Sequence, residues 1–392
     1  MRSTRLISLA VVAIALLTSA GLAQQPGPDG PYRILKTARV GGEGGWDYIY
    51  ADAASRRLYI PRGATRGTPA TDTTPAVPPS VNRITVFNLD TLDPVGDIPD
   101  TGGNGVTICP NTGHGFSTSH PAISMFDTKT LTLIKKIDLA AGASGDGLYC
   151  DPFNDRVYIF SHPTKDATVI DAKDGTVLGV IGLGGVPEQG VADGNGTLYV
   201  VMQDRPGSVA VVDVKTMKTT AHYPFGDNGR CNGLTLDGKN RILFAACAAT
   251  GPAPAAQSTP TAPPAAPAPL PQPMMVILKA TDGTILTKLP LAGGSDGAAF
   301  NPATMEAFSS HGNGTLTVVK EKSPTTFEVE QNLQTMNGAR TITLDSGSDH
   351  LFVMSQEYGA PPAPTTPPAA GGRGGGRGPA IPGSFTILMI GR

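Results

Sequence analysis

The sequence predicts an all-β fold, a seven-bladed β-propeller made of four-stranded antiparallel blades. The first observation is a phrase that recurs seven times: a polar or Gly-Gly lead-in, an apolar strand, a tight turn and a second strand ending in a loop. The second is the spacing of the seven first strands, which start 57, 42, 42, 44, 64 and 44 residues apart. A period in the low forties built only from strand-like segments is typical of propeller blades. The third is the composition, since 49 Gly and 36 Pro residues supply the turns that many short strands need.

The third repeat shows the strand pattern most clearly. Residues 146–150 are its expected inner strand, followed by strands at 156–160, 167–171 and 176–183, with Asp- and Asn-containing turns between them. Two other repeats follow the same plan, with expected strands at 197–202, 208–213 and 219–224, and at 306–310, 315–320 and 326–333.

The two ends of the chain complete the last repeat. The chain stops after an expected third strand at 384–390, and the missing fourth strand is available at residues 32–40. We therefore expect the N-terminal strand to pair in the last blade and close the ring, which removes an exposed sheet edge. Residues 32–392 then form a single propeller domain.

Residues 1–23 have the features of a signal peptide. Arg2 and Arg5 precede an apolar stretch at 6–17, and small residues lead to a cleavage site after Ala23. The apolar stretch is too short for a stable membrane span, so we expect a periplasmic or secreted protein with no span after cleavage. Residues 24–31 are expected to be a flexible N-terminus.

The charge balance argues against nucleic-acid binding. The sequence contains 30 basic and 32 acidic residues, and loss of Arg2 and Arg5 leaves a net charge near −4. No basic run is present that would neutralise phosphates. We therefore expect no nucleic-acid partner.

Three low-complexity insertions, at 62–80, 248–273 and 359–383, interrupt the repeats. They are rich in Pro, Ala, Thr and Gly, so we expect flexible loops without a packed core. All three fall between the second and third strands of a blade, and these loops share a face with the connections that enter the inner strands. The insertions are either a lid or docking fringe for a small molecule or protein partner, or insertions that the fold tolerates.

The blade pattern resembles the YVTN-type seven-bladed propellers, and especially the exported YncE-like proteins. The matching pairs of segments are 57–60 with 85–88, 156–159 with 168–171, and 198–201 with 210–213. The resemblance covers nearly all of residues 32–392 and implies the fold, because this family lacks a common activity. Some relatives of the fold carry quinone, haem or copper centres, but this chain has no Cys-x-x-Cys-His motif and only six His residues.

One polar residue per repeat stands where the inner strand starts, beside the central channel. These positions are Asp47, Asn104, Asp146, Glu188, Asn232, Asp296 and Arg340. They would either cap backbone N–H groups of the tight connections between blades, or bind a small polar ligand or a hard cation in a concave ring. Carboxylates and amides form an oxygen-rich set suited to Ca²⁺ or another divalent cation. The candidate metal ligands are Asp146, Glu188, Asn232 and Asp296.

Three histidines stand at equivalent ends of second strands: His120, His162 and His311. Second strands of neighbouring blades diverge, so their ends should lie roughly 10 Å apart, about twice the spacing of paired strands. We therefore expect these side chains either to form hydrogen bonds or to contact a ligand at the rim, rather than to bind a metal.

The four cysteines form two pairs of related positions. Cys231 opens an inner strand and Cys247 ends the strand that pairs with it, so the two are nearly opposite and we expect a disulfide in an exported protein. Exported YncE-like relatives tend to have Cys at both places. Cys109 and Cys150 occupy nearly equivalent positions on successive inner strands and could bridge two blades, but we favour buried thiols.

The best-supported function is a ligand-binding or protein-interaction scaffold, a monomer with its polar site at the channel mouth, and we predict no catalytic residues. The first alternative is a metal-dependent hydrolase similar to the gluconolactonase-type propellers, which hold a divalent cation on Glu, Asn and Asp. Glu188, Asn104 or Asn232, and Asp146 or Asp296 would supply those residue types. The second alternative, a redox-cofactor subunit, is disfavoured by the scarcity of ligands. Trp46 is expected to pack between blades rather than on a ligand.

Overall fold

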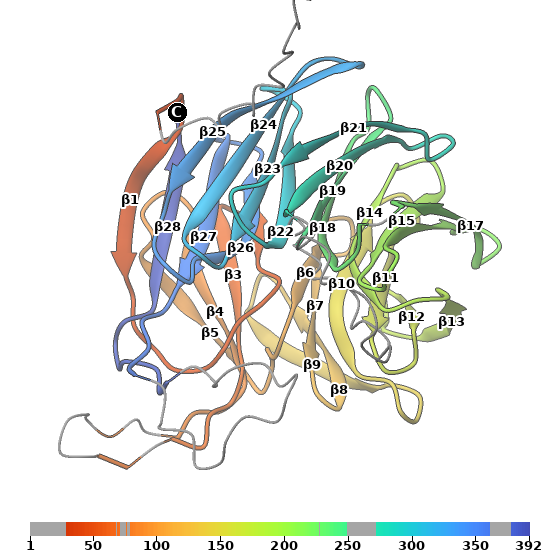
Figure 1. Ribbon diagram of the computed structural model, residues 1–392. Helices are drawn as coiled ribbons and strands as arrows, with labels where there is room; N and C mark the ends of the chain where they lie inside the picture. Colours follow the sequence, from red (N-terminus) through yellow and green to blue (C-terminus); the bar gives the residue numbers. More distant parts are fainter. Residues whose placement is uncertain are drawn as a thin grey trace, which may run out of the picture.

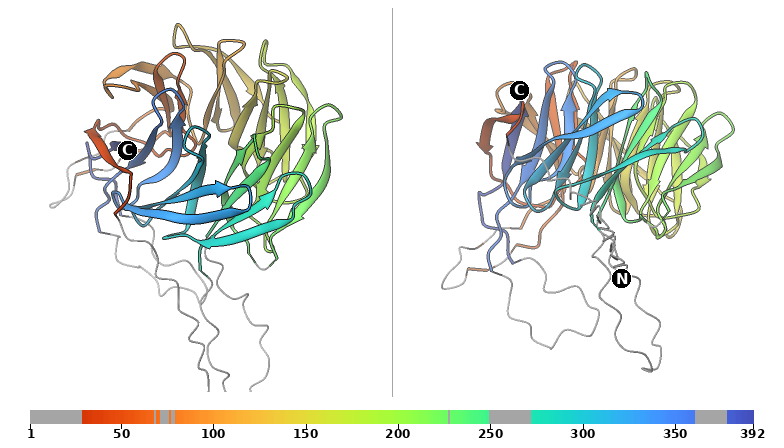
Figure 2. Two further views of the ribbon diagram at one scale, coloured as in Figure 1. Left: turned by 90° about the horizontal axis from the view of Figure 1, so that it is seen from above. Right: turned by 45° about the horizontal axis from the view of Figure 1, so that its top comes forward.

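The structure is a computed structural model that describes residues 29–67, 69–70, 76, 79–226, 228–248, 272–360 and 378–392. These residues form seven four-stranded antiparallel sheets around a central axis, and no helix occurs among them (Figure 1). The first strand of each sheet contacts the first strands of its neighbours, so these strands line a central channel (Figure 2). The protein is therefore a seven-bladed β-propeller, as the repeats predict.

The strands run from the channel outward in chain order within each of blades A to F. Blade A contains β2 (Tyr50–Asp52), β3 (Arg57–Arg62), β4 (Arg83–Asn88) and β5 (Pro94–Pro99), and blade B contains β6 (Val106–Cys109), β7 (His114–Ser119), β8 (Ala122–Asp127) and β9 (Thr132–Asp138). Blade C contains β10 (Gly145–Asp151), β11 (Arg156–Ser161), β12 (Asp166–Asp171) and β13 (Val177–Gly182), and blade D contains β14 (Pro187–Ala192), β15 (Thr197–Met202), β16 (Ser208–Asp213) and β17 (Lys218–Pro224). Blade E contains β18 (Cys231–Asp237), β19 (Ile242–Cys247), β20 (Met274–Lys279) and β21 (Ile285–Pro290), and blade F contains β22 (Ser295–Asn301), β23 (Glu306–His311), β24 (Thr315–Ser323) and β25 (Thr326–Gln334).

Blade G is built from both ends of the described chain. It contains β26 (Arg340–Asp345), β27 (His350–Ser355) and β28 (Thr386–Gly391), and its outer strand is β1 (Arg33–Arg39). Strands β1 and β28 are antiparallel, with Arg33 opposite Gly391 and Arg39 opposite Thr386. The predicted closure of the ring by the N-terminal strand is confirmed.

The burial of each strand follows its place in the blade. Strand β15 is buried at every residue after its first, because neighbouring blades cover both of its faces. Strand β17, at the outer edge of the same blade, alternates between exposed and half-buried residues. This difference explains why second and third strands are continuous apolar runs in the sequence.

The hydrophobic core is divided among the interfaces between blades. Seven clusters of buried side chains each join two adjacent blades. At the interface of blades G and A, the Trp46 ring meets the Phe385 ring edge to face, with centroids 4.9 Å apart. Trp46 is therefore a core residue between blades, as expected.

Two disulfides reinforce the inner part of the ring. Cys231 and Cys247 lie opposite each other on β18 and β19 and are bonded, which confirms the predicted pair. Cys109 and Cys150 are also bonded, with their Cα atoms 5.6 Å apart, so the preference for buried thiols is wrong. Successive inner strands run side by side, and equivalent positions on β6 and β10 therefore face each other across the interface.

The face on which the insertions are placed is fixed by strand register. The start of each inner strand pairs with the end of the second strand, as Ser295 does with His311. The second strands β3, β19 and β27, which precede the three insertions, therefore end on the face where the inner strands start. Most of these insertions, the predicted signal peptide (residues 1–23) and residues 24–28 lie outside the described residues. No helix long and apolar enough to cross a membrane occurs in the described ranges.

Candidate functional site

The predicted ring of polar residues lies at one mouth of the central channel. Its side chains interact across the channel: the carboxylate of Asp47 in blade A is electrostatically coupled to Asp296 in blade F, Asp146 in blade C and Glu188 in blade D. Asn104 is exposed and Glu188 is buried, while the other five members are half-buried. The mouth is therefore narrow enough for side chains of non-adjacent blades to act on one another.

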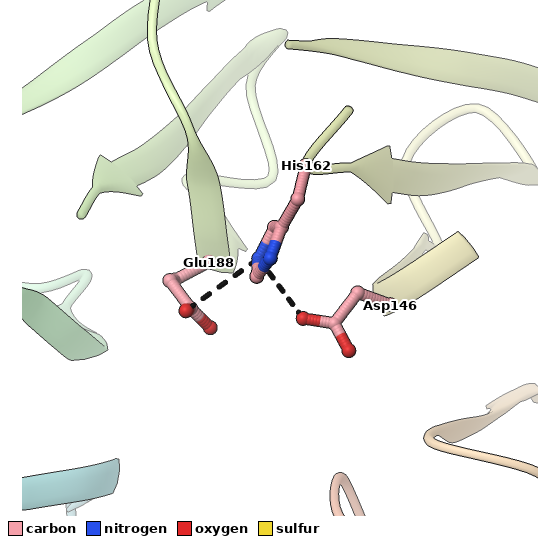
Figure 3. Close-up of side chains that lie close together, drawn as sticks. All are labelled: Asp146, His162 and Glu188. Atoms are coloured by element: carbon pink, nitrogen blue, oxygen red, sulfur yellow. Dashed lines mark ion pairs between the residues drawn. The ribbon is translucent and has the colours of Figure 1, made fainter. Parts of the chain in front are cut away.

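The tightest convergence in this mouth joins blades C and D. His162 Nε2 lies 3.0 Å from Asp146 Oδ2 and 3.5 Å from Glu188 Oε1 (Figure 3). One ligand-type atom from each of the three residues lies within 4.8 Å of the other two. The structure thus adds His162 to the predicted metal candidates Asp146 and Glu188.

The local fold explains why His162 reaches the mouth. It is the first residue after β11, and its side chain turns inward between the starts of β10 and β14 (Figure 3). From the sequence, the ends of neighbouring second strands are expected to lie too far apart for two histidines to bind one metal ion. Here a single imidazole approaches carboxylates on two inner strands, so the cluster needs no second histidine.

Each of the two carboxylates has a side-chain partner that orients it. Asn104 Nδ2 donates a 2.7 Å hydrogen bond to Asp146 Oδ1, which leaves Oδ2 directed at His162. Tyr48 donates to Glu188 Oε2 at 2.7 Å, and Gln203 Nε2 donates to Glu188 Oε1 at 2.6 Å. These recorded bonds are made with side chains rather than with backbone N–H groups, which favours the ligand-binding interpretation of these ring members over the capping one.

The concentration of acidic groups shifts their protonation. Burial raises the pKa of Glu188 to about 7, and the nearby Asp146 carboxylate acts in the same direction. Burial and the carboxylates of Asp296 and Asp146 raise the pKa of Asp47 well above its ordinary value. The adjacent Asp146 carboxylate raises the pKa of the His162 imidazole. Burial is the largest cause of the shifts of Glu188 and Asp47, and the negative charge gathered at the mouth adds to it.

Arg340 is the one basic member of the ring. Its Nη1 lies 3.8 Å from Asp296 Oδ2, and its Nη2 donates a 2.9 Å hydrogen bond to the carbonyl of Trp46. The guanidinium also lies over the Trp46 ring, 5.2 Å from the centroid. Arg340 is therefore anchored to blade A and offsets part of the acidic charge.

A cavity of about 410 Å³ adjoins the mouth on the side of blades A and B. Its polar lining includes Asp47, Asn104, His120, Ser144 and Arg340. His120 is exposed, and its Nδ1 lies 3.3 Å from the Ser144 hydroxyl. A small molecule bound here would contact the same Asn104 that orients Asp146.

Gly103 gives Asn104 its position at the edge of this cavity. Its φ of 132° is in a region that L side chains rarely adopt. A Cβ atom at this position would stand 1.9 Å from the carbonyl oxygen of Thr118. The close contact of the two backbones therefore requires glycine.

The remaining predicted site residues are placed differently. His311 is fully buried, and its Nε2 lies 3.0 Å from the Thr317 hydroxyl on β24. Burial lowers the pKa of His311 to about 4, so it is neutral at physiological pH. Asn232 is half-buried, and its Oδ1 lies 3.5 Å from Gln203 Nε2.

Sequence reasoning missed two contributors to the site. Neither Tyr48 nor Gln203 is among the predicted site residues. Tyr48 donates to Glu188 from blade A, and Gln203 donates to it from blade D. The signals in the sequence are that Tyr48 directly follows the ring residue Asp47 and that Gln203 directly follows a second strand, as His162 does.

Comparisons with known proteins define the fold. No protein-family model matches the chain, and no curated protein matches its sequence. Among solved structures, hydrazine synthase of Kuenenia stuttgartiensis is similar with a TM-score of 0.62 and 12% identity, over 85% of this chain and 95% of that one. The WD40 repeats of RRP9 are similar with a TM-score of 0.62 and 11% identity, over 94% of this chain and 99% of that one. At such identities the likeness shows a β-propeller and carries no activity with it.

Proposed function

We propose that this protein is an exported, YncE-like binding propeller that holds a divalent cation at the acidic mouth of its central channel. The observation that carries the proposal is the charge of the ring, which contains one guanidinium, of Arg340, and four carboxylates, those of Asp47, Asp146, Glu188 and Asp296. Carboxylates gathered in a half-buried site repel one another, and a bound cation relieves that repulsion. Burial raises the pKa of Asp47, and repulsion from Asp296 and Asp146 raises it further.

Export is the expected setting for this function. Two disulfides among the described residues favour an oxidising compartment, because cytosolic thiols are kept reduced. The apolar segment at 6–17 supplies the export signal. The mature protein would then meet its cation and any partner in the periplasm or outside the cell, on the face that bears the insertions.

Thermal unfolding of the chelator-treated protein tests cation binding. A ligand that binds only the folded state raises the free energy of unfolding by RT ln(1 + [L]/Kd), and the melting temperature rises as a result. We expect at least one of Ca²⁺, Mg²⁺, Mn²⁺ and Zn²⁺ to raise the melting temperature. The double substitution Asp47→Asn and Asp296→Asn should weaken that increase. Asp282→Asn is the matched control, because it removes one negative charge from the turn between β20 and β21 of blade E. Unchanged melting with every cation would contradict the proposal.

A metal-dependent hydrolase is the second candidate, because the site offers three protein ligands beside a cavity. Catalytic metal sites typically keep a coordination position open for water or substrate, whereas structural sites close all four. The cavity of about 410 Å³ could hold a small lactone. We would expect metal-loaded protein to hydrolyse gluconolactone faster than buffer containing the same metal, and Glu188→Gln to abolish the difference. Equal rates with and without the protein would exclude this lactonase activity.

A further inference from the structure

We propose that Asp146, His162 and Glu188 bind a divalent first-row transition metal ion such as Zn²⁺, in preference to Ca²⁺. This inference rests on the proposed function and deepens it by naming the class of cation and its ligands. It changes the sequence-based expectation of a hard, all-oxygen site, because one of the three converging groups is an imidazole.

The distances between ligand atoms suit a small transition metal. In a tetrahedral site with metal–ligand distances of about 2.0 Å, neighbouring ligand atoms lie about 3.3 Å apart. The two separations from His162 Nε2, 3.0 Å to Asp146 Oδ2 and 3.5 Å to Glu188 Oε1, bracket this value. The ligand atoms of the two carboxylates lie within 4.8 Å of each other, so the carboxylates would move closer together to share one ion with His162.

The placement of the His162 ring supports ligation by Nε2. This nitrogen is buried, and the carboxylate oxygens of Asp146 and Glu188 lie 3.0 Å and 3.5 Å from it. A metal ion binds a neutral imidazole and releases the proton that the ring would otherwise carry. The same nitrogen is therefore placed to bind an ion that the two carboxylates share.

Neighbouring side chains orient the two carboxylate ligands. Asn104 donates to Asp146, while Tyr48 and Gln203 donate to Glu188, so both carboxylates have a second partner that fixes their direction. Metal sites depend on such outer contacts for affinity. Their presence at this one cluster distinguishes it from a chance gathering of surface acids.

The donor types decide between metals. Ca²⁺ and Mg²⁺ prefer oxygen ligands, whereas imidazole suits Zn²⁺ and neighbouring first-row ions. Two carboxylates and one imidazole therefore favour Zn²⁺ over Ca²⁺. With three protein ligands, water or a bound small molecule would complete the coordination.

Calorimetric titration of the chelator-treated mature protein with Zn²⁺ and with Ca²⁺ tests this inference. We expect one Zn²⁺ per chain, bound at least about tenfold more tightly than Ca²⁺. His162→Ala should weaken Zn²⁺ binding by about 10- to 100-fold and change Ca²⁺ binding little. His222→Ala is the matched control, because His222 is an exposed histidine on the outer strand β17 and its loss should leave Zn²⁺ affinity unchanged. Zn²⁺ affinity that survives His162→Ala, or that falls equally in His222→Ala, would overturn the assignment.

A measurement on the unaltered protein covers the case in which His162→Ala fails to fold. Electron paramagnetic resonance of the Cu²⁺-loaded wild type should show hyperfine coupling to one imidazole nitrogen, and its absence would overturn the assignment. The two proposals also fail differently. If no divalent cation binds, the proposed function is wrong. If Ca²⁺ and Zn²⁺ bind equally and neither depends on His162, cation binding stands and the transition-metal site is wrong.

Discussion

The hydroxyl of Tyr48 in blade A donates a 2.7 Å hydrogen bond to Glu188 Oε2 in blade D. These residues are 140 positions apart in the sequence and belong to blades that are not neighbours in the ring. The bond therefore crosses the channel mouth and ties opposite sides of the ring together. It also gives the buried Glu188 carboxylate a donor that partly offsets its desolvation.

Loss of this bond should destabilise the protein. Tyr48→Phe leaves one oxygen of a buried carboxylate without its donor, and we expect the free energy of unfolding to fall by about 1–2 kcal/mol. Urea denaturation at pH 8 would measure the change. Tyr50→Phe is the control, since the described structure records no hydrogen bond of the Tyr50 hydroxyl, and equal losses in the two variants would contradict the role of the bond.

A buried carboxyl group away from the mouth should make stability depend on pH. Glu321 is 3% exposed, and burial raises its pKa to about 7, with Asp237 adding to the effect. The folded state therefore holds a proton that the unfolded state releases near pH 4.5. The stabilisation that Glu321 contributes should be complete below that pH and be lost as the pH rises to about 7, by an amount on the order of 2 kcal/mol.

The substitution Glu321→Gln should make this dependence less steep between pH 5 and pH 8, while Glu188, whose pKa burial also raises to about 7, keeps its own contribution. The amide keeps an acceptor for Asn240, which donates to Glu321 Oε1 at 2.7 Å, and it carries no ionisable proton. Glu328→Gln, which removes an exposed partner of Lys322, should leave the wild-type slope unchanged. Chemical denaturation across the pH range gives the result, and a slope retained in Glu321→Gln would show that another group is responsible.

Gly103 should be far less replaceable than a glycine in open space. Gly103→Ala adds a Cβ atom 1.9 Å from a backbone oxygen, and Gly113→Ala adds one with no heavy atom within 4 Å. Both residues have positive φ, so the second variant measures the backbone strain alone, about 1 kcal/mol. We expect Gly103→Ala to lower the free energy of unfolding by at least about 2 kcal/mol more than Gly113→Ala. Similar losses would mean that the backbones relax to admit the methyl group.

The two disulfides should contribute unequally to stability. Cys109 and Cys150 are separated by 41 positions in the sequence, and Cys231 and Cys247 are separated by 16. The chain-entropy relation then gives about 4 kcal/mol for the first bond and about 3 kcal/mol for the second. Paired Cys→Ala variants followed by denaturant unfolding would compare them. Mass spectrometry without reduction should first show that none of the four thiols is free.

The sequence was sufficient for the blades because propeller blades are local structures. Residues 197–202 and 208–213 were predicted as strands and coincide with β15 and β16. Turn residues and apolar runs a few positions apart specify such hairpins without reference to the rest of the chain. The pairing of Cys231 with Cys247 followed from the same local register.

The contacts between blades were decided by the tertiary structure. The repeat predicts the seven ring positions, but it does not show which of them lie close enough to form a site. Only the packing of blades C and D singles out Asp146 and Glu188 and brings the His162 imidazole between them. The bond between Cys109 and Cys150 likewise depends on how two inner strands lie side by side, which the sequence of either strand does not specify. Local sequence therefore determined the blades and the polar ring, while the distances of a few ångströms that create a metal-type site arose from side chains meeting across blades.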